Sequence, residues 1–443
     1  MLKYLLIIAG LWSGALTTAY AQDTVTAPMK WDLQTCLDYA KKNNITIKSL
    51  RWGARSSEQD LLQSRAAKLP NLNASLTQSV VNSNNANPVV GGFQTQANAS
   101  GNYGVTSNWV LYNGGYLNND IKQKNVLLES ANLNVQGAEN DITLQITQAY
   151  LNILLQKENI VYLQELVGTS QSQLELGKQR FDAGALSRKD YLQLEATLAN
   201  DKYNLTSAIN AHRTNLITLK QILQLPSSTN FDVVQPDTIV TNQAVVTLPE
   251  AEDAAVKTRP EVKIGELGVQ SAQYELEKSR AGALPTISVG AGLSSGYSDN
   301  QDLKYFSQLN NNFYQRLGVT VAIPIFANRI NKSNIERSKI QIEQAKLSLQ
   351  GTKTTLDQAV EQAYINVLNA QAQLTTAEAQ WSINQESFKI TNEQLRLGAF
   401  NTIDLLTQKN LYTQALQAYV QAKYNNILNK KIYEFYTGVP VTL

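Results

Sequence analysis

The fold of this chain is decided by residues 142–187, which read ITLQITQAYLNILLQKENIVYLQELVGTSQSQLELGKQRFDAGALS. Apolar residues recur along this stretch at a heptad-like spacing: Ile142, Ile146, Ala149, Ile153, Ile160, Leu163, Val167 and Leu174. No proline occurs from Gly115 to Leu225. Gly184 follows the periodic run directly, and glycine is the usual helix stop because it adopts positive φ without Cβ strain. We expect a helix over 119–182, a tight turn at Gly184 and a second long helix running back.

The predicted helix is too long and too polar to be a membrane span. At 1.5 Å rise per residue, residues 119–182 extend roughly 95 Å, about three times the hydrocarbon thickness of a bilayer. The stretch is rich in Gln, Asn, Lys and Glu. It is therefore predicted to be a rod in water whose apolar stripe needs neighbouring helices.

The start of the chain indicates export. Lys3 precedes an apolar run over residues 5–16, and Ala19-Tyr20-Ala21 has the small-x-small form of a cleavage site. This predicts a secretory signal peptide cut after Ala21, with an uncleaved anchor as the alternative. Gln22 would be the first mature residue, and since it is not a cysteine, a lipid anchor there is not indicated.

The composition argues against nucleic-acid binding, metal binding and catalysis. A net charge of +2 with no Lys/Arg block favours no nucleic acid. Cys36 and His212 are each the single residue of their type, so neither a disulfide within the chain nor a His/Cys metal site is expected. No Gly-rich loop follows a strand to open a phosphate-binding helix. We expect neither a cofactor nor enzymatic activity.

An internal repeat with an offset of about 214 residues divides the mature chain into two halves. Three pairs of segments carry it: residues 68–70 with 283–285, Gly104-Val105-Thr106 with Gly318-Val319-Thr320, and residues 148–152 with 362–366. The turn at Gly184 with Asp190 corresponds to Gly398 with Asp404. We predict a first repeat over 22–247 and a second over 248–443.

Each repeat contains a predicted strand hairpin, at about 71–112 and about 286–326. Apolar residues alternate with small or polar ones, as in Leu72, Ala74, Leu76 against Asn73, Ser75, Thr77, and in Val289, Leu293, Val319 against Gly290, Ser294, Thr320. Period two is a strand signal. The pattern fits a half-buried sheet of a soluble protein or the wall of a transmembrane β-barrel. The signal peptide, the uncharged small residues of one face, and aromatic residues near strand ends favour the barrel.

Four strands cannot close a membrane barrel, because the smallest such barrels have eight. An open sheet edge in lipid leaves backbone groups unsatisfied at several kcal/mol each. The barrel must then be shared between chains. The helical stripes need neighbours too, so the sequence predicts an oligomer.

The repeated order of helix, strand hairpin, long helix, turn and helix resembles the TolC-type outer-membrane efflux channels. The resemblance covers essentially the whole mature chain and includes Arg180-Phe181-Asp182-Ala183-Gly184 and Leu397-Gly398-Ala399-Phe400. It implies an α+β membrane protein, a homotrimer with a shared 12-stranded barrel and a periplasmic α-helical barrel. It also implies a passive exit duct of a tripartite efflux pump or type I secretion system, in the outer membrane of a Gram-negative bacterium. Its partners would be a periplasmic adaptor and an inner-membrane transporter.

The resemblance also implies roles for the hairpin ends. Residues 82–102 and 295–315 would be external loops. Adaptor docking is expected at the two helix turns: Ala183, Gly184, Ala185, Leu186, Leu397, Gly398, Ala399 and Phe400. Asp404 would form an acidic ring at the periplasmic mouth, with Thr407 in place of a second acid and Asp190 as the counterpart in the first repeat. Phe400 stands where some members have a basic closing partner.

Two alternatives remain open from the residues. Asp190 and Asp404 each lie three residues after Ser187 and Asn401, so both fit helix capping as well as a mouth role. The rival function from another class is a non-transporting exported coiled-coil adhesin or envelope spacer.

Overall fold

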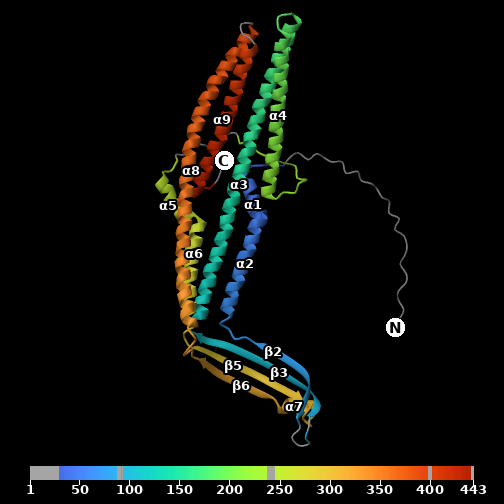
Figure 1. The fold of residues 1–443 in the computed structure, drawn as a ribbon, viewed down its shortest axis with the longest axis vertical. Helices are drawn as coiled ribbons and strands as arrows, with labels where there is room; N and C mark the ends of the chain where they lie inside the picture. The colour runs from blue at the N-terminus through green and yellow to red at the C-terminus, as the bar shows by residue number, and fades with distance from the viewer. Residues whose placement is uncertain (1–28, 87–90, 92, 237–244, 398–401, 441–443) are drawn as a thin grey trace, which may run out of the picture.

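The computed structural model describes residues 29–86, 91, 93–236, 245–397 and 402–440 (Figure 1). The helices are α1 (Leu33–Asn43), α2 (Ile45–Ala66), α3 (Tyr116–Asp182), α4 (Arg188–Leu223), α5 (Leu248–Thr258), α6 (Pro260–Ala281), α7 (Tyr305–Asn311), α8 (Ile330–Arg396) and α9 (Thr402–Tyr436). The strands are β1 (Met29–Trp31), β2 (Asn73–Ala86), β3 (Phe93–Asn113), β4 (Phe231–Val233), β5 (Thr286–Ser298) and β6 (Tyr314–Ala322).

Two long helical hairpins, α3–α4 and α8–α9, lie side by side and turn at the same end of the molecule (Figure 1). Helices α2 and α6 continue the bundle toward the sheet at the opposite end. The two halves have elements of matching length: 22 residues in α2 and α6, 67 in α3 and α8, and 36 and 35 in α4 and α9. At 67 residues, α3 is about 100 Å long.

Local chemistry explains several helix ends. Asp32 caps α1, because its side chain accepts a hydrogen bond from the backbone N–H of Thr35. Asn44 caps α2 in the same way, since its side chain accepts from the backbone N–H groups of Thr46 and Ile47. Thr247 and Glu250 form a reciprocal capping box at the start of α5. The predicted stop before Pro70 agrees with the end of α2 at Ala66.

The buried stripe of α3 differs from the predicted one toward the turn. The apolar residues Ile146, Ala149 and Ile153 are buried as expected. Nearer Gly184 the buried positions are Leu166, Ser170, Gln173 and Gly177. The predicted stripe residues Val167 and Leu174 are only half-buried. Because these positions are mostly polar or small, the apolar pattern alone could not locate this part of the interface.

The main sheet has the antiparallel order β2-β3-β5-β6, so strands from the two halves pair at its centre. A second, two-stranded sheet joins β1 to β4 in parallel, which the sequence did not predict. Residues directly opposite in neighbouring strands share a face. Leu76 pairs with Tyr103, and Val105 with Leu293, while Thr106 pairs with Gly292. The predicted separation of an apolar face from a small and polar face is confirmed by this register.

Three predicted boundaries of the hairpins were wrong. The segment 295–315 is not a loop throughout, because β5 continues to Ser298, α7 spans Tyr305–Asn311 and β6 begins at Tyr314. The Asn- and Gly-rich segment 82–102 is not a loop throughout, because β2 continues to Ala86 and β3 begins at Phe93. The ladder continues through this segment, with Asn82 paired with Ala97 and Asn84 with Thr95. β6 ends at Ala322, so Ile323 and Ile325 lie beyond it. Pro324 lacks the N–H that a continuing ladder requires.

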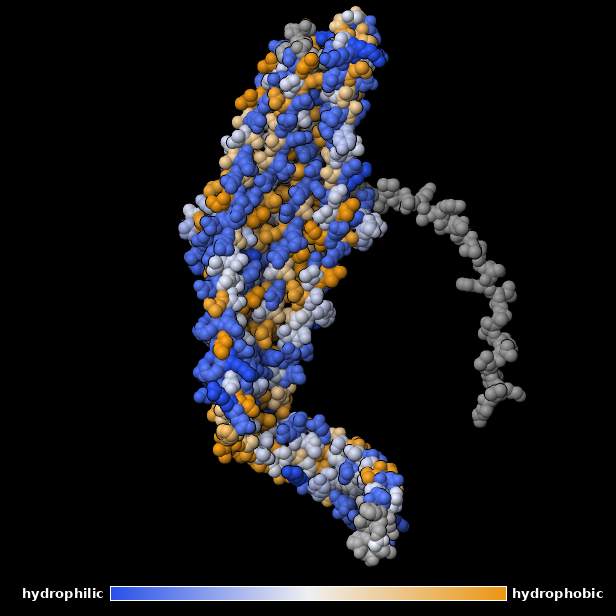
Figure 2. Space-filling model, viewed as in Figure 1, coloured by the Kyte–Doolittle hydropathy of each residue, from blue (hydrophilic) through white to orange (hydrophobic). Residues whose placement is uncertain are grey.

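The largest buried cluster of the described residues joins α1, α3, α4, α9 and the β1–β4 sheet at mid-length of the bundle, and it includes the fully buried side chain of Tyr150. Tyr150 donates a hydrogen bond of 2.6 Å to the backbone oxygen of Val234. No helix in the described ranges carries an apolar stretch sufficient to cross a bilayer. Hydrophilic residues cover much of the helical part on the face shown in Figure 2, with apolar residues between them.

Candidate functional site

The turn between α3 and α4 is built as the sequence predicted. Gly184 has a φ of 74°, and Ala185 N donates to the backbone oxygen of Arg180 at 2.8 Å, which closes the end of α3. Ala183, Gly184 and Ala185 are exposed, and Leu186 is half-buried. Phe181 and Tyr191 stack across the turn with ring centroids 5.4 Å apart. The turn therefore presents small, accessible residues beside a stacked aromatic pair.

Asp190 takes part in the predicted cap of α4. Its backbone N–H donates to Ser187 Oγ at 3.1 Å, and its carboxylate accepts from the Ser187 hydroxyl at 2.7 Å. The carboxylate also lies in the first helical turn, where the helix dipole favours negative charge. This geometry favours the capping interpretation of Asp190, and its role at a channel mouth stays a prediction.

The second turn is described only at its edges. Gly398, Ala399 and Phe400 lie outside the described residues, as does Asn401. Leu397 is 77% exposed at the end of α8. Asp404 and Thr407 are exposed on the first turns of α9, and their spacing of three residues places them on one helix face.

An arginine that the sequence left without a role connects the two hairpins near the turns. Arg180 Nη2 of α3 donates to the backbone oxygens of Leu395 at 2.7 Å and Arg396 at 3.2 Å. These carbonyls belong to the last turn of α8, where backbone oxygens commonly need partners from outside the helix. Arg180 thus serves as a C-cap for the neighbouring hairpin.

A buried charge cluster connects the hairpins at a second level. Lys409 of α9 binds both the carboxylate of Asp201 on α4 and the hydroxyl of Ser170 on α3. The side chains of Lys409 and Asp201 are only 2% and 6% exposed. Desolvation lowers the pKa of Lys409, and the Asp201 carboxylate opposes that shift.

The sequence contains a signal for this pair in the apolar spacing of α4 and α9. Asp201 occupies one position of the repeating series Leu194, Leu198, Asp201, Leu205, Ala208, and Lys409 one position of Leu405, Lys409, Tyr412, Leu416. Both charges therefore stand where the spacing calls for an apolar residue. Their opposite signs could have suggested a buried pair.

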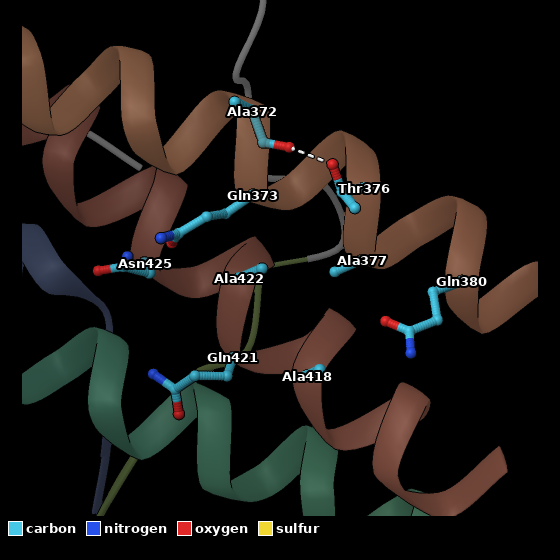
Figure 3. A pocket seen from close by; sticks show the side chains of 9 residues that line it. All are labelled: Ala372, Gln373, Thr376, Ala377, Gln380, Ala418, Gln421, Ala422 and Asn425. Atoms are coloured by element: carbon cyan, nitrogen blue, oxygen red, sulfur yellow. Dashed lines mark hydrogen bonds between the residues drawn. The ribbon is translucent and has the colours of Figure 1, made fainter. Parts of the chain in front are cut away.

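A shallow groove runs between α8 and α9 (Figure 3). It is lined by alanines and uncharged polar residues: Ala372, Gln373, Thr376, Ala377, Gln380, Ala418, Gln421, Ala422 and Asn425. Thr376 turns its hydroxyl back to the oxygen of Ala372 at 3.0 Å. Amides and methyl groups of this kind supply neither a nucleophile nor an acid–base pair, so the groove fits contact or passage rather than catalysis.

At the other end of the molecule, the described strands of the sheet leave apolar side chains and two strand edges uncovered. Apolar side chains of one face are largely exposed, with Leu76 and Leu317 each at 79% and Val80 at 72%. Within the described strands, β2 and β6 each pair on one side only. An exposed apolar face and two free edges mark a surface that another molecule or a membrane covers.

Comparison with known proteins agrees with this architecture. The family model for outer membrane efflux proteins matches residues 36–224 and 253–429. The chain belongs to the outer membrane efflux protein family. The predicted resemblance to TolC-type channels is confirmed, and members of this family are transport ducts rather than enzymes.

Two relatives and one solved structure illustrate these similarities. The outer membrane efflux protein BepC of Brucella suis is 23% identical over 432 residues, covering 96% of this chain and 88% of BepC. The proteases secretion protein PrtF of Dickeya chrysanthemi is 20% identical over 299 residues, covering 64% and 61% of the two chains. The crystal structure of the CmeC outer membrane channel of Campylobacter jejuni matches with a TM-score of 0.77 at 17% identity, over 99% of this chain and 94% of CmeC.

Proposed function

We propose that the chain forms a passive homotrimeric exit duct in the outer membrane, as part of a tripartite efflux pump or a type I secretion system. The observation that carries this proposal is the open four-stranded sheet with its exposed apolar face. Every pair in it is antiparallel, so β2 and β6 run in opposite directions. The β6 edge of one copy can therefore pair antiparallel with the β2 edge of the next.

Closure of the sheet through three copies in a membrane would pair the two free strand edges and cover the exposed apolar face. Three sheets of four strands give twelve strands, within the even numbers found for outer-membrane barrels. Each backbone group left unpaired in lipid would cost several kcal/mol. The apolar face, with Leu76, Val80 and Leu317, would then meet lipid, and the small and polar face would line the lumen.

The helices carry the duct away from the membrane. Helices α3 and α8 extend about 100 Å, which suits a periplasmic tunnel ending at the turns. A signal peptide cut after Ala21 would deliver the chain there. Energy would come from an inner-membrane transporter reached through a periplasmic adaptor. Relatives named for efflux and for protease secretion support both kinds of system.

Planar-bilayer conductance of the purified protein tests the duct. We expect discrete channels, and a detergent-corrected mass of three chains by light scattering. A monomeric protein without conductance, or one recovered in the soluble periplasmic fraction, would instead support the adhesin or spacer alternative.

Contact with an adaptor is tested by a photocrosslinking residue at Ala185, which is exposed and next to the turn. Gly184 itself is unsuitable, because any side chain there is strained at its positive φ. Leu186, Ala183 and the second turn, Leu397 to Phe400, are further positions of the proposed docking surface. A probe at exposed Tyr203, at mid-length of α4, is the control, and equal capture at both positions would argue against docking at the turns.

We place Asp404 at the periplasmic mouth of the proposed duct, together with Thr407 and Asp190. Three copies of Asp404 around an axis would attract multivalent cations. Asp404→Ala should weaken their block of conductance from the periplasmic side, whereas Thr407→Ala should leave it unchanged. Unaltered block in Asp404→Ala would show that no acidic ring forms there.

A further inference from the structure

The strands of the main sheet contain a single charged side chain. Residues 73–113, which include β2 and β3, hold no Asp, Glu, Lys or Arg, and β5 holds none either. Arg316, the third residue of β6, is the exception. Its side chain is exposed on the isolated chain.

The strand register assigns Arg316 to the small and polar face. Arg316 lies directly opposite Gly292, Gly292 opposite Thr106, and Thr106 opposite Asn73, so these residues form one row across four strands. Neighbouring Gln315 and Leu317 belong to the apolar face with Leu293 and Ala291. An arginine on the lipid face at mid-membrane would cost about 2–4 kcal/mol, so its place on the other face is also the energetically favoured one.

We infer that Arg316 determines the ion preference of the outer-membrane part of the duct, forming a ring of three positive charges in an otherwise uncharged wall. The inference rests on the proposed trimeric duct. Whichever register β6 adopts with the β2 strand of the next copy, that strand supplies no counter-charge, because β2 has no charged residue. The ring therefore keeps its full charge and favours anionic over cationic solutes.

The groups outside the strands do not cancel this ring by direct contact. Asp299, Asp302 and Lys304 lie in the exposed segment between β5 and α7, beyond the end of the ladder. Among the described residues, the ion pairs include none that involves Arg316. Gly292 directly beside it adds no side chain that could cover the guanidinium.

The size of the effect follows from Coulomb's law with screening. Three unit charges about 10 Å from the axis, at 0.1 M salt, change the ratio of anions to cations on the axis by roughly fivefold. The remaining length of the lumen dilutes this local effect. We expect Arg316→Gln to lower the measured Cl⁻ to K⁺ permeability ratio by about twofold at 0.1 M salt, and by much less at 1 M, where the Debye length is about 3 Å.

The experiment measures reversal potentials in planar bilayers under a KCl gradient. Arg316→Gln should lower the Cl⁻ to K⁺ permeability ratio, Arg316→Glu should lower it further, and Arg316→Lys should leave it unchanged because the charge is kept. Lys304→Gln is the matched control, since it removes the same charge outside the strands and should have the smaller effect. An unchanged permeability ratio in a conducting Arg316→Gln channel, or an equal shift in Lys304→Gln, overturns the assignment of Arg316. A wild-type protein that does not conduct overturns the duct itself.

Discussion

The buried pair of Lys409 and Asp201 makes a strong prediction about stability. Asp201→Ala would leave the Lys409 ammonium, whose side chain is 2% exposed, without its counter-ion between three helices. Removing one partner of a buried ion pair costs about 3–5 kcal/mol, whereas replacing both partners by apolar residues is often neutral or stabilising. We expect a large loss of thermal stability in Asp201→Ala and its recovery in the double variant Asp201→Leu with Lys409→Met.

The pH dependence of the single variant follows from the same desolvation. Burial already lowers the pKa of Lys409, and loss of Asp201 removes the interaction that raises it. The unfolded chain then binds more protons than the folded one between the folded pKa and the ordinary lysine value near about 10.4, so stability rises with pH in that window. The destabilisation of Asp201→Ala should accordingly shrink as the pH is raised from 7 toward that value.

Thermal unfolding in detergent, followed by circular dichroism, measures both effects. Asp253→Ala is the control, because its ion pair with Lys257 on α5 is exposed, at 76% and 73%, and exposed pairs contribute little. If Asp201→Ala lost no more stability than Asp253→Ala, or if the double variant were as unstable as the single one, the pair would not hold the hairpins together as described.

Three further predictions concern single residues. Burial lowers the pKa of His212, although its Nε2 lies 3.9 Å from Asp232 Oδ1. Protonation therefore favours the unfolded chain, and stability should fall as the pH drops below about 6.5. His212→Gln should reduce this loss of stability in melting curves recorded between pH 7 and 5. Cys36 is 0% exposed and burial raises the pKa of its thiol to about 12, so a maleimide at pH 7.5 should label it only after denaturation, and rapid labelling of the native protein would contradict its placement. Gly184→Ala should lower stability by about 1–2 kcal/mol because Gly184 has a positive φ, while Gly168→Ala inside α3 should raise it by about 0.5–1 kcal/mol. Neither added Cβ would meet another atom within 4 Å. Equal effects of the two substitutions on stability would therefore show that backbone conformation is not the cause.

The local pattern of the sequence determined the long elements of this protein. The heptad-like spacing and Gly184 predicted α3, its turn and α4, because helix period and positive φ are properties of a few neighbouring residues. The alternation of residues along the strands likewise predicted which side chains share a face. Glycine and asparagine misled the prediction at 82–102, because pairing with the opposite strand outweighed their weak strand propensity.

Only the tertiary structure decided which distant residues meet. The pairing of β3 with β5, the cap that Arg180 provides for α8, and the parallel β1–β4 sheet each join segments far apart in sequence. Lys409 and Asp201 are 208 residues apart in sequence. In the sequence each is a single charged residue in an apolar stripe, and only the packing of the helices shows that they form a pair. Periodicity fixes the direction in which a side chain points along its own helix, but the partner it finds depends on how the helices are aligned against one another, and that alignment is set by the whole bundle.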